Sequence, residues 1–168
     1  MADEKVEGRC FDTIDVHGAR YEKPKSAQGF IKLEVTRGKA DPVPLETNWI
    51  SFAMEDTSLS LEAYFGEDTG HLVQAVGFMA IIMPTVGDYE IRDPFGGEPW
   101  QVAALFGKGR PDANLQGDNY GKGMLTISDV FNESARKYIK GNFKFIYLDR
   151  SGVVVKVVSE EFSAEYDG

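Results

Sequence analysis

The chain has 168 residues, of which 42% are hydrophobic and 12% aromatic, and its formal net charge is −9. The length predicts one β domain over residues 1–168 with a core of its own, and the hydrophobic content excludes a disordered chain. The negative charge disfavours nucleic acid as a partner, because the protein would repel phosphate backbones. No apolar run approaches the roughly 20 residues of a membrane-spanning helix, so membrane insertion is not expected.

The N-terminal segment carries the sequence information on cellular compartment. Residues 1–8 lack the apolar run of a secretory signal and are expected to form a flexible tail. We expect a cytoplasmic location if this N-terminus is native, and an extracytoplasmic location if a signal has been trimmed. The single cysteine, Cys10, cannot form an intramolecular disulfide.

The first part of the chain contains short strand patterns separated by turn residues. Residues 30–36 alternate apolar and polar side chains, which predicts a strand with one solvated face. Pro42 and Pro44 keep the next segment out of the centre of a sheet. Two further strands are predicted at 49–54 and 58–65.

The middle of the chain mixes strand patterns with long polar stretches. Residues 71–83 are long enough for a helix, but their β-branched residues favour a buried strand. Short strands are predicted at 86–91 and 100–106. Residues 107–121 are predicted to form a long polar loop, and such loops often carry function in compact domains.

The last third of the chain gives the clearest pattern. Strands are predicted at 123–128, 139–147 and 153–158, with a turn at 149–152 and a connecting loop at 131–138. Many short strands with little helix predict an all-β fold, either an antiparallel two-sheet sandwich or a flattened barrel.

Aromatic residues in loops are the best indication of a binding surface, because a ring covers much apolar area at low entropic cost. The predicted ligand-binding residues are Phe95, Trp100, Asn119 and Tyr120. Of these, Phe95 and Tyr120 lie in glycine-rich loops and are expected to be the most exposed.

The polar stretch also contains candidate calcium ligands. Asp112, Asn114 and Asp118 place oxygen-bearing side chains as in the first half of an EF-hand loop. The twelfth position is Gly123, where a glutamate is expected, so a plain polar turn is the alternative. Apart from this calcium site, no cofactor is predicted.

No residue is predicted to be catalytic. The two histidines, His17 and His71, do not form a metal-binding pair, although Asp15 and His17 would share one face of a strand. Two carboxylate pairs in apparent turns are weaker candidates for acid–base chemistry: Asp88 with Glu90, and Glu67 with Asp68.

Four stretches carry a family resemblance: Val86-Gly-Asp-Tyr-Glu-Ile91, Gly123-Met-Leu-Thr-Ile127, Ile139-Lys-Gly-Asn-Phe-Lys-Phe145 and Glu161-Phe-Ser163. Together they resemble a family of small bacterial β-domains of unknown function, many of them secreted lipoproteins. The resemblance is limited to the C-terminal half. It implies a β-sandwich with a surface or binding role and supplies no catalytic residue. The chain departs from the family in lacking a lipobox-like cysteine and in having Glu161 where glycine is usual.

Three hypotheses for function follow. The first is a non-enzymatic module that binds a glycan or protein partner through the aromatic-bearing loops at 92–100 and 107–120. The second is an acidic protein-interaction or inhibitory protein, for example a toxin-neutralising one, which docks on a basic surface. The third is a small β-barrel hydrolase or lyase that uses Asp15, His17 or a carboxylate pair. The sequence leaves the oligomeric state open.

Overall fold

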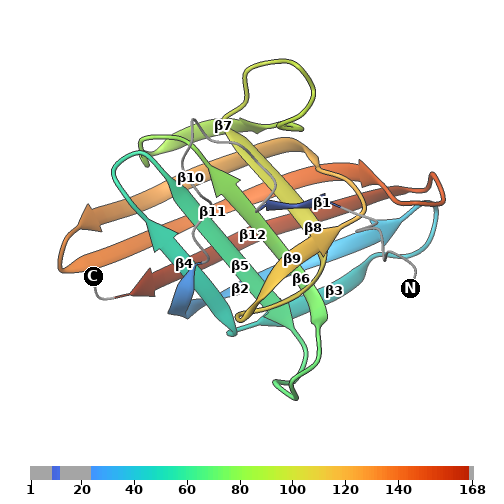
Figure 1. Ribbon diagram of the computed structural model, residues 1–168, viewed down its shortest axis with the longest axis horizontal. Helices are drawn as coiled ribbons and strands as arrows, with labels where there is room; N and C mark the ends of the chain where they lie inside the picture. The colour runs from blue at the N-terminus through green and yellow to red at the C-terminus, as the bar shows by residue number, and fades with distance from the viewer. Residues whose placement is uncertain (1–8, 12–23, 167–168) are drawn as a thin grey trace, which may run out of the picture.

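The computed structural model describes residues 9–11 and 24–166 (Figure 1). These residues form twelve β-strands and no α-helix, which confirms the predicted all-β fold. The strands are β1 (Arg9–Cys10), β2 (Lys25–Arg37), β3 (Val43–Thr47), β4 (Ile50–Met54), β5 (Leu59–Phe65), β6 (Val73–Ala80), β7 (Gly87–Ile91), β8 (Val102–Arg110), β9 (Ala113–Gly117), β10 (Lys122–Glu133), β11 (Arg136–Leu148) and β12 (Val154–Tyr166).

Hydrogen bonds join all these strands into one sheet, in the order β1-β9-β8-β6-β5-β4-β2-β12-β11-β10-β7, with β3 paired to β2. Neighbouring strands are antiparallel except β7 and β8, which make a single parallel pair through Ile91 and Val102. The sheet folds over into two layers whose strands cross (Figure 1). One layer contains β4, β5, β6 and β8, and the other contains β2, β12, β11 and β10. The layers are therefore continuous in their hydrogen bonding.

The main core fills the space between the two layers. Alternate residues of the long strands point inward, and the largest are aromatic rings from both layers. The ring of Phe78 on β6 lies 5.9 Å from that of Phe143 on β11 and 5.6 Å from that of Phe162 on β12, both edge-on. Each fully buried phenylalanine contributes about 1.5–3 kcal/mol relative to an exposed one.

A second apolar cluster covers the outer face of β5, β6 and β8. It includes Phe11, Tyr64, Leu105, Leu115 and Tyr120. These strands are buried on both faces, and their sequences are accordingly nearly continuous runs of apolar residues. The buried strand predicted within residues 71–83 is confirmed as β6.

Two predicted loops are wrong, because both segments continue the sheet. Within 107–121, β8 extends to Arg110 and β9 starts at Ala113, so the polar stretch is a hairpin anchored by buried Leu115. Within 131–138, β10 and β11 run on to a short turn. There the guanidinium of Arg136 lies 5.6 Å from the ring centres of both Phe131 and Tyr138.

The proline-containing segment lies where the sequence places it. Pro44 belongs to β3, which pairs with β2 on one side only, at the edge of the sheet.

In residues 9–11 and 24–166, no helix is long and apolar enough to cross a membrane.

Candidate functional site

The outer face of the β2–β12–β11–β10 layer is interrupted by irregularities that lie side by side. The register of β10 against β11 shifts between Ile127 and Asp129. The register of β11 against β12 shifts after Gly141, and that of β12 against β2 shifts after Val158. Bulges bend a strand and increase its twist, so adjacent bulges hollow the outer face of the sheet.

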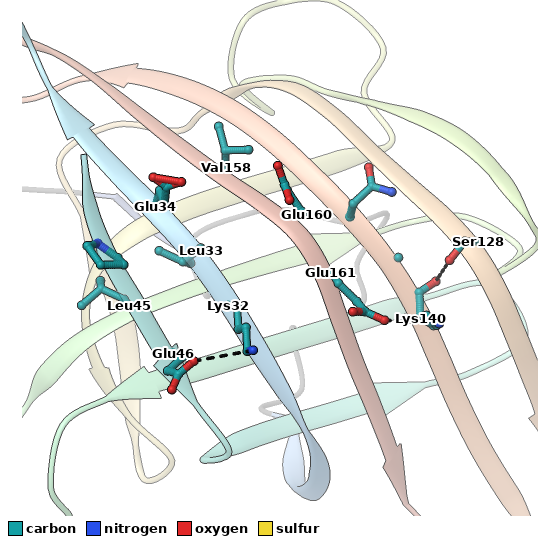
Figure 2. Close-up of a pocket in the computed structure, with 13 residues that line it drawn as sticks. Lys32, Leu33, Glu34, Leu45, Glu46, Ser128, Lys140, Val158, Glu160 and Glu161 are labelled. Carbon is teal, nitrogen blue, oxygen red and sulfur yellow. Dashed lines mark hydrogen bonds and ion pairs between the residues drawn. The ribbon is translucent and has the colours of Figure 1, made fainter. Parts of the chain in front are cut away.

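The hollow forms a groove of about 780 Å³, which we call the bulge groove (Figure 2). Its apolar lining residues are Pro44 and Val158, which lie in one row with Glu34, together with Leu33 and Leu45, whose side chains pack against the main core. Its remaining lining residues are Lys32, Glu34, Glu46, Ser128, Lys140, Gly141, Asn142, Glu160 and Glu161. The groove therefore combines an apolar floor with a charged rim and contains no aromatic ring.

The bulge of β12 is held by a buried serine. The hydroxyl of Ser159, which is 1% exposed, donates to the carbonyl of Lys32 at 2.7 Å, and the carbonyl of Glu161 lies 3.2 Å away. On the other side of the groove, Ser128 Oγ donates to the carbonyl of Lys140 at 3.1 Å. These bonds occupy carbonyls that the interrupted strand pairing would otherwise leave without a donor.

The rim carries four glutamates and two lysines. Lys32 Nζ lies 3.9 Å from Glu46 Oε2, and Lys140 Nζ lies 3.3 Å from Glu161 Oε1. These pairs are exposed and contribute little to stability. Figure 2 shows the other two acids, Glu34 and Glu160, on either side of Val158. Within the described part of the chain, neither makes an ion pair.

The predicted aromatic surface is only partly present. Phe95 is 56% exposed, as expected, whereas Trp100 is half-buried against the second apolar cluster. The expected exposure of Tyr120 is wrong: it is 4% exposed, and its hydroxyl donates to the carbonyl of Cys10 at 2.9 Å. The rings of Phe95 and Tyr120 are 5.9 Å apart. Tyr120 is buried because it packs in the second apolar cluster, where its ring lies 6.5 Å from that of Phe11, just after β1.

The two polar residues before Tyr120 connect distant parts of the fold. Asn119 Nδ2 donates to the carbonyl of Leu148 at 2.5 Å. Asp118 Oδ1 lies 3.1 Å from Arg150 Nε, and its other oxygen accepts from the Arg150 amide at 3.2 Å. Both side chains thus hold the turn between β11 and β12 against the end of β9.

The candidate calcium ligands are spread along the hairpin. Asp112 lies in the turn before β9, where its carboxylate is 2.8 Å from Arg110 Nε. Asp118 follows the other end of β9, beside Arg150, and Asn114 is on the strand between them. In residues 9–11 and 24–166, no three side chains of His, Cys, Asp or Glu converge as a metal site would require.

The residues considered for acid–base chemistry are exposed wherever the structure describes them. Asp15 and His17 lie outside the described residues, and His71 is exposed. The Asp88 carboxylate accepts a 2.8 Å hydrogen bond from Thr126, and Asp68 lies 3.0 Å from Arg110. Glu90 is 2.8 Å from the guanidinium of Arg92, whose hydrogen bond lowers the pKa of this carboxyl.

One buried polar cluster was missed by the sequence reasoning. Glu62, on β5, is fully buried, and it accepts a 2.8 Å hydrogen bond from the phenol of Tyr64. Ser51 on β4 lies 3.3 Å from the same phenol oxygen, and the Trp49 ring is 5.2 Å from that of Tyr64. Alternation like that of residues 58–65 is typical of a strand with one solvated face, whereas the structure covers the face that carries Glu62 with the second apolar cluster.

The bulge groove was missed as well, although the sequence carries one signal for it. Glu160 and Glu161 place two charges in succession where the alternation of β12 requires one inward-pointing residue, and such a break indicates a bulge.

Comparisons of the chain with protein-family models, with curated proteins and with solved structures give no significant match.

Proposed function

We propose that the protein is a non-enzymatic protein-interaction module that binds a lysine- or arginine-bearing segment of a partner in the bulge groove. The observation that carries this proposal is the position of Glu34 and Glu160. Both carboxylates are exposed on either side of Val158, and neither has an ion-pair partner in the described part of the chain.

The chemistry of the groove suits a long cationic side chain. Lysine and arginine carry apolar stems that pack on aliphatic surface while the charged end stays among polar groups. In the groove, the stem would lie on Val158 and Pro44, and the charged end would lie between the carboxylates of Glu34 and Glu160. The two lysines of the groove, Lys32 and Lys140, are already beside glutamates and leave the rim with an excess of negative charge.

The net charge of −9 supports the same type of partner. A negative protein attracts a basic surface over long distances, which speeds association and makes it sensitive to salt. A glycan-binding surface finds less support, because such surfaces rely on exposed rings. Tyr120 is buried, Trp100 is half-buried, and the groove contains no ring.

The test is a titration of the full chain with a fluorescent peptide of alternating lysine and valine, followed by anisotropy at low salt. The paired substitution Glu34→Gln/Glu160→Gln should weaken binding by about tenfold or more, which corresponds to about 1.4 kcal/mol. The matched control is Glu67→Gln/Glu133→Gln, which changes the net charge equally at exposed sites outside the groove.

The two variants separate a groove from a general charge effect. Binding that is weak in the groove variant and unchanged in the control supports the proposal. Equal weakening in both variants would show that only net charge matters, and no binding by the unmodified chain would also overturn the proposal. Circular dichroism of each variant checks that the sheet is intact.

A further inference from the structure

A second cavity, which shares no lining residue with the bulge groove, lies at one end of the space between the two layers. We call it the end cavity, and its volume is about 390 Å³. One layer contributes the ends of β2 and β11 and the turn after β11, and the other side is built from β6, β8 and β9. The lining residues are Arg37, Gln74, Phe106, Gly107, Lys108, Gln116, Gly117, Asp118, Tyr147 and Arg150.

Two cations enter the end cavity from opposite layers. The residues of β2 that face the main core end at Val35, and Arg37 is the next position on that face. On β8 the core-facing residues end at Phe106, and the next position on that face is Lys108. Side chains two positions apart on a strand point the same way, so both cations start from the inner faces of the layers.

Two amide side chains flank Lys108 in one row across the sheet. Gln74 on β6 and Gln116 on β9 are its register partners on either side. Register partners on strands about 4.8 Å apart point to the same face, so both amides border the cavity together with Lys108. Each amide adds two N–H donors to those of the lysine. This wall of the end cavity is therefore rich in hydrogen-bond donors.

The inner wall of the end cavity consists of two buried rings and the arginine that lies against them. Phe106 is 2% exposed and Tyr147 is 7% exposed. The guanidinium carbon of Arg37 lies 5.9 Å from the centre of the Phe106 ring. Burial raises the pKa of Tyr147, although the charge of Arg37 and a hydrogen bond from it act in the opposite direction. The phenol is therefore neutral at neutral pH and keeps an O–H that can donate into the cavity.

The third cation is held in place by the one carboxylate of the lining. Asp118 Oδ1 lies 3.1 Å from Arg150 Nε, and the other oxygen accepts from the Arg150 amide. Asp149 does not line the cavity, and its carboxylate accepts from two backbone amides of its own turn. Within the described part of the chain, neither Arg37 nor Lys108 makes an ion pair. The lining thus carries two positive charges in excess, on a protein whose net charge is −9.

We propose that the end cavity binds the phosphate group of a small phosphorylated molecule. A phosphate monoester carries a charge of about −1.5 to −2 near pH 7, which matches the excess of two positive charges. Its three terminal oxygens accept hydrogen bonds from arginine, lysine, amide and phenol donors, and the planar guanidinium groups suit phosphate geometry. A carboxylate would leave one of the positive charges without a counter-charge.

The size of the end cavity indicates what the phosphate is attached to. About 390 Å³ is more than a bare phosphate fills, and it falls in the range of about 300–1,000 Å³ typical of small-molecule sites. A polynucleotide fits less well, because the protein around this site is acidic and repels a chain of phosphates. The site is separate from the bulge groove, and neither proposal depends on the other.

The test is nuclear magnetic resonance of the full chain, labelled with nitrogen-15, in titrations with inorganic phosphate and with phenyl phosphate. Constant ionic strength and a pH of about 7.5, above the second phosphate pKa of about 6, keep both probes doubly charged. Saturable shifts are expected at the amides of Lys108, Gly117 and Arg150, and phenyl phosphate should bind more tightly than inorganic phosphate. Acetate should bind more weakly than either.

The variant Arg37→Gln/Lys108→Gln should weaken the binding of phenyl phosphate at least tenfold. The matched control is Lys144→Gln/Lys156→Gln, which removes the same charge at exposed positions that do not line the end cavity. If the double variant fails to fold, Lys108→Gln alone still tests the site at an exposed position and should weaken binding several-fold. Circular dichroism checks the sheet in every variant.

Weakening in the cavity variant alone, with shifts confined to the end cavity, supports the proposal. Equal weakening in both double variants would show a general charge effect and overturn it. The absence of saturable binding of either phosphate probe, or shifts centred elsewhere, would overturn it as well. Acetate that binds as tightly as phenyl phosphate would contradict the assignment to phosphate. Binding of the lysine–valine peptide by Arg37→Gln/Lys108→Gln should match that of the unmodified chain, so the outcome at the bulge groove is read separately.

Discussion

The phenol of Tyr64 donates a 2.8 Å hydrogen bond to Glu62 Oε1, and both side chains are fully buried. The two residues are separated by one position on β5, so the alternation of the strand places them on the same face. That face points away from the main core and into the second apolar cluster. A buried carboxyl is costly without hydrogen-bond donors, and Tyr64 supplies one of them.

Removal of the phenol oxygen should destabilise the protein without changing its fold. Tyr64→Phe leaves a buried carboxyl oxygen without this donor, so we expect the free energy of unfolding to fall by about 1–3 kcal/mol. Urea denaturation at pH 7 measures the change. The control is Tyr138→Phe, at a half-buried ring near the turn between β10 and β11. Equal stability of Tyr64→Phe and the unmodified chain would contradict the argument.

Stability should also depend on alkaline pH through the same tyrosine. Burial, and next the nearby Glu62, raise the pKa of Tyr64 above its ordinary value of 10.0. The folded state therefore favours the neutral phenol. The resulting stability is complete below about pH 10 and declines as the pH rises above it, by at most about 1.4 kcal/mol per pH unit for one group.

A series of urea denaturation curves between neutral pH and about pH 11.5 tests this dependence, because that range crosses the ordinary tyrosine pKa. Burial also raises the pKa of Tyr147. Tyr64→Phe should remove part of the alkaline decline, and Tyr64→Phe/Tyr147→Phe should remove more. An identical decline in the unmodified chain and the double variant would assign it to other groups.

The strands were predictable from the sequence where one face of the strand is exposed to solvent and the other face is buried in the core. Residues 30–36 alternate cleanly, and the structure places them within β2, with Ile31, Leu33 and Val35 in the core. The same rule could not reveal the surroundings of Glu62, because sequence alternation cannot show that a second layer of residues covers the outer face. The predicted strand at 153–158 was too short, since the bulge at Ser159 lets β12 continue to Tyr166.

The candidate site was less predictable than the strands because it is built from distant segments. Glu34 becomes a neighbour of Val158 and Glu160 only through the pairing of β2 with β12. Tyr120 similarly meets the carbonyl of Cys10 across a long stretch of chain. A sequence shows local alternation and turn residues, whereas strand register between remote segments depends on the packing of the whole sheet.

Calcium should have no effect on the hairpin of β8 and β9. Asp112 and Asp118 lie beyond opposite ends of β9, and each carboxylate is beside an arginine, Arg110 or Arg150. We therefore expect the same melting temperature in excess calcium and in a chelator, measured by differential scanning fluorimetry. Magnesium at equal concentration controls for ionic strength. A calcium-specific rise that Asp112→Asn/Asp118→Asn abolishes would show that these residues bind the ion.

Gly141 on β11 should not tolerate a larger residue. A Cβ at this position would lie 2.1 Å from the carbonyl oxygen of Thr126 on the neighbouring strand, and a backbone atom cannot move aside as a side chain can. Gly141→Ala should therefore reduce the free energy of unfolding by about 1–3 kcal/mol or more, as other overpacked sites do. The absence of a side chain at this position allows β10 and β11 to approach closely beside the bulge.

The matched control for Gly141→Ala is the next residue on the same strand. Asn142 is exposed, so Asn142→Ala should change stability by no more than about 0.5 kcal/mol. Urea denaturation of both variants under one set of conditions compares them directly. If Gly141→Ala were as stable as Asn142→Ala, the strands could separate at this point without cost, and the close approach of β10 and β11 would not be what requires glycine there.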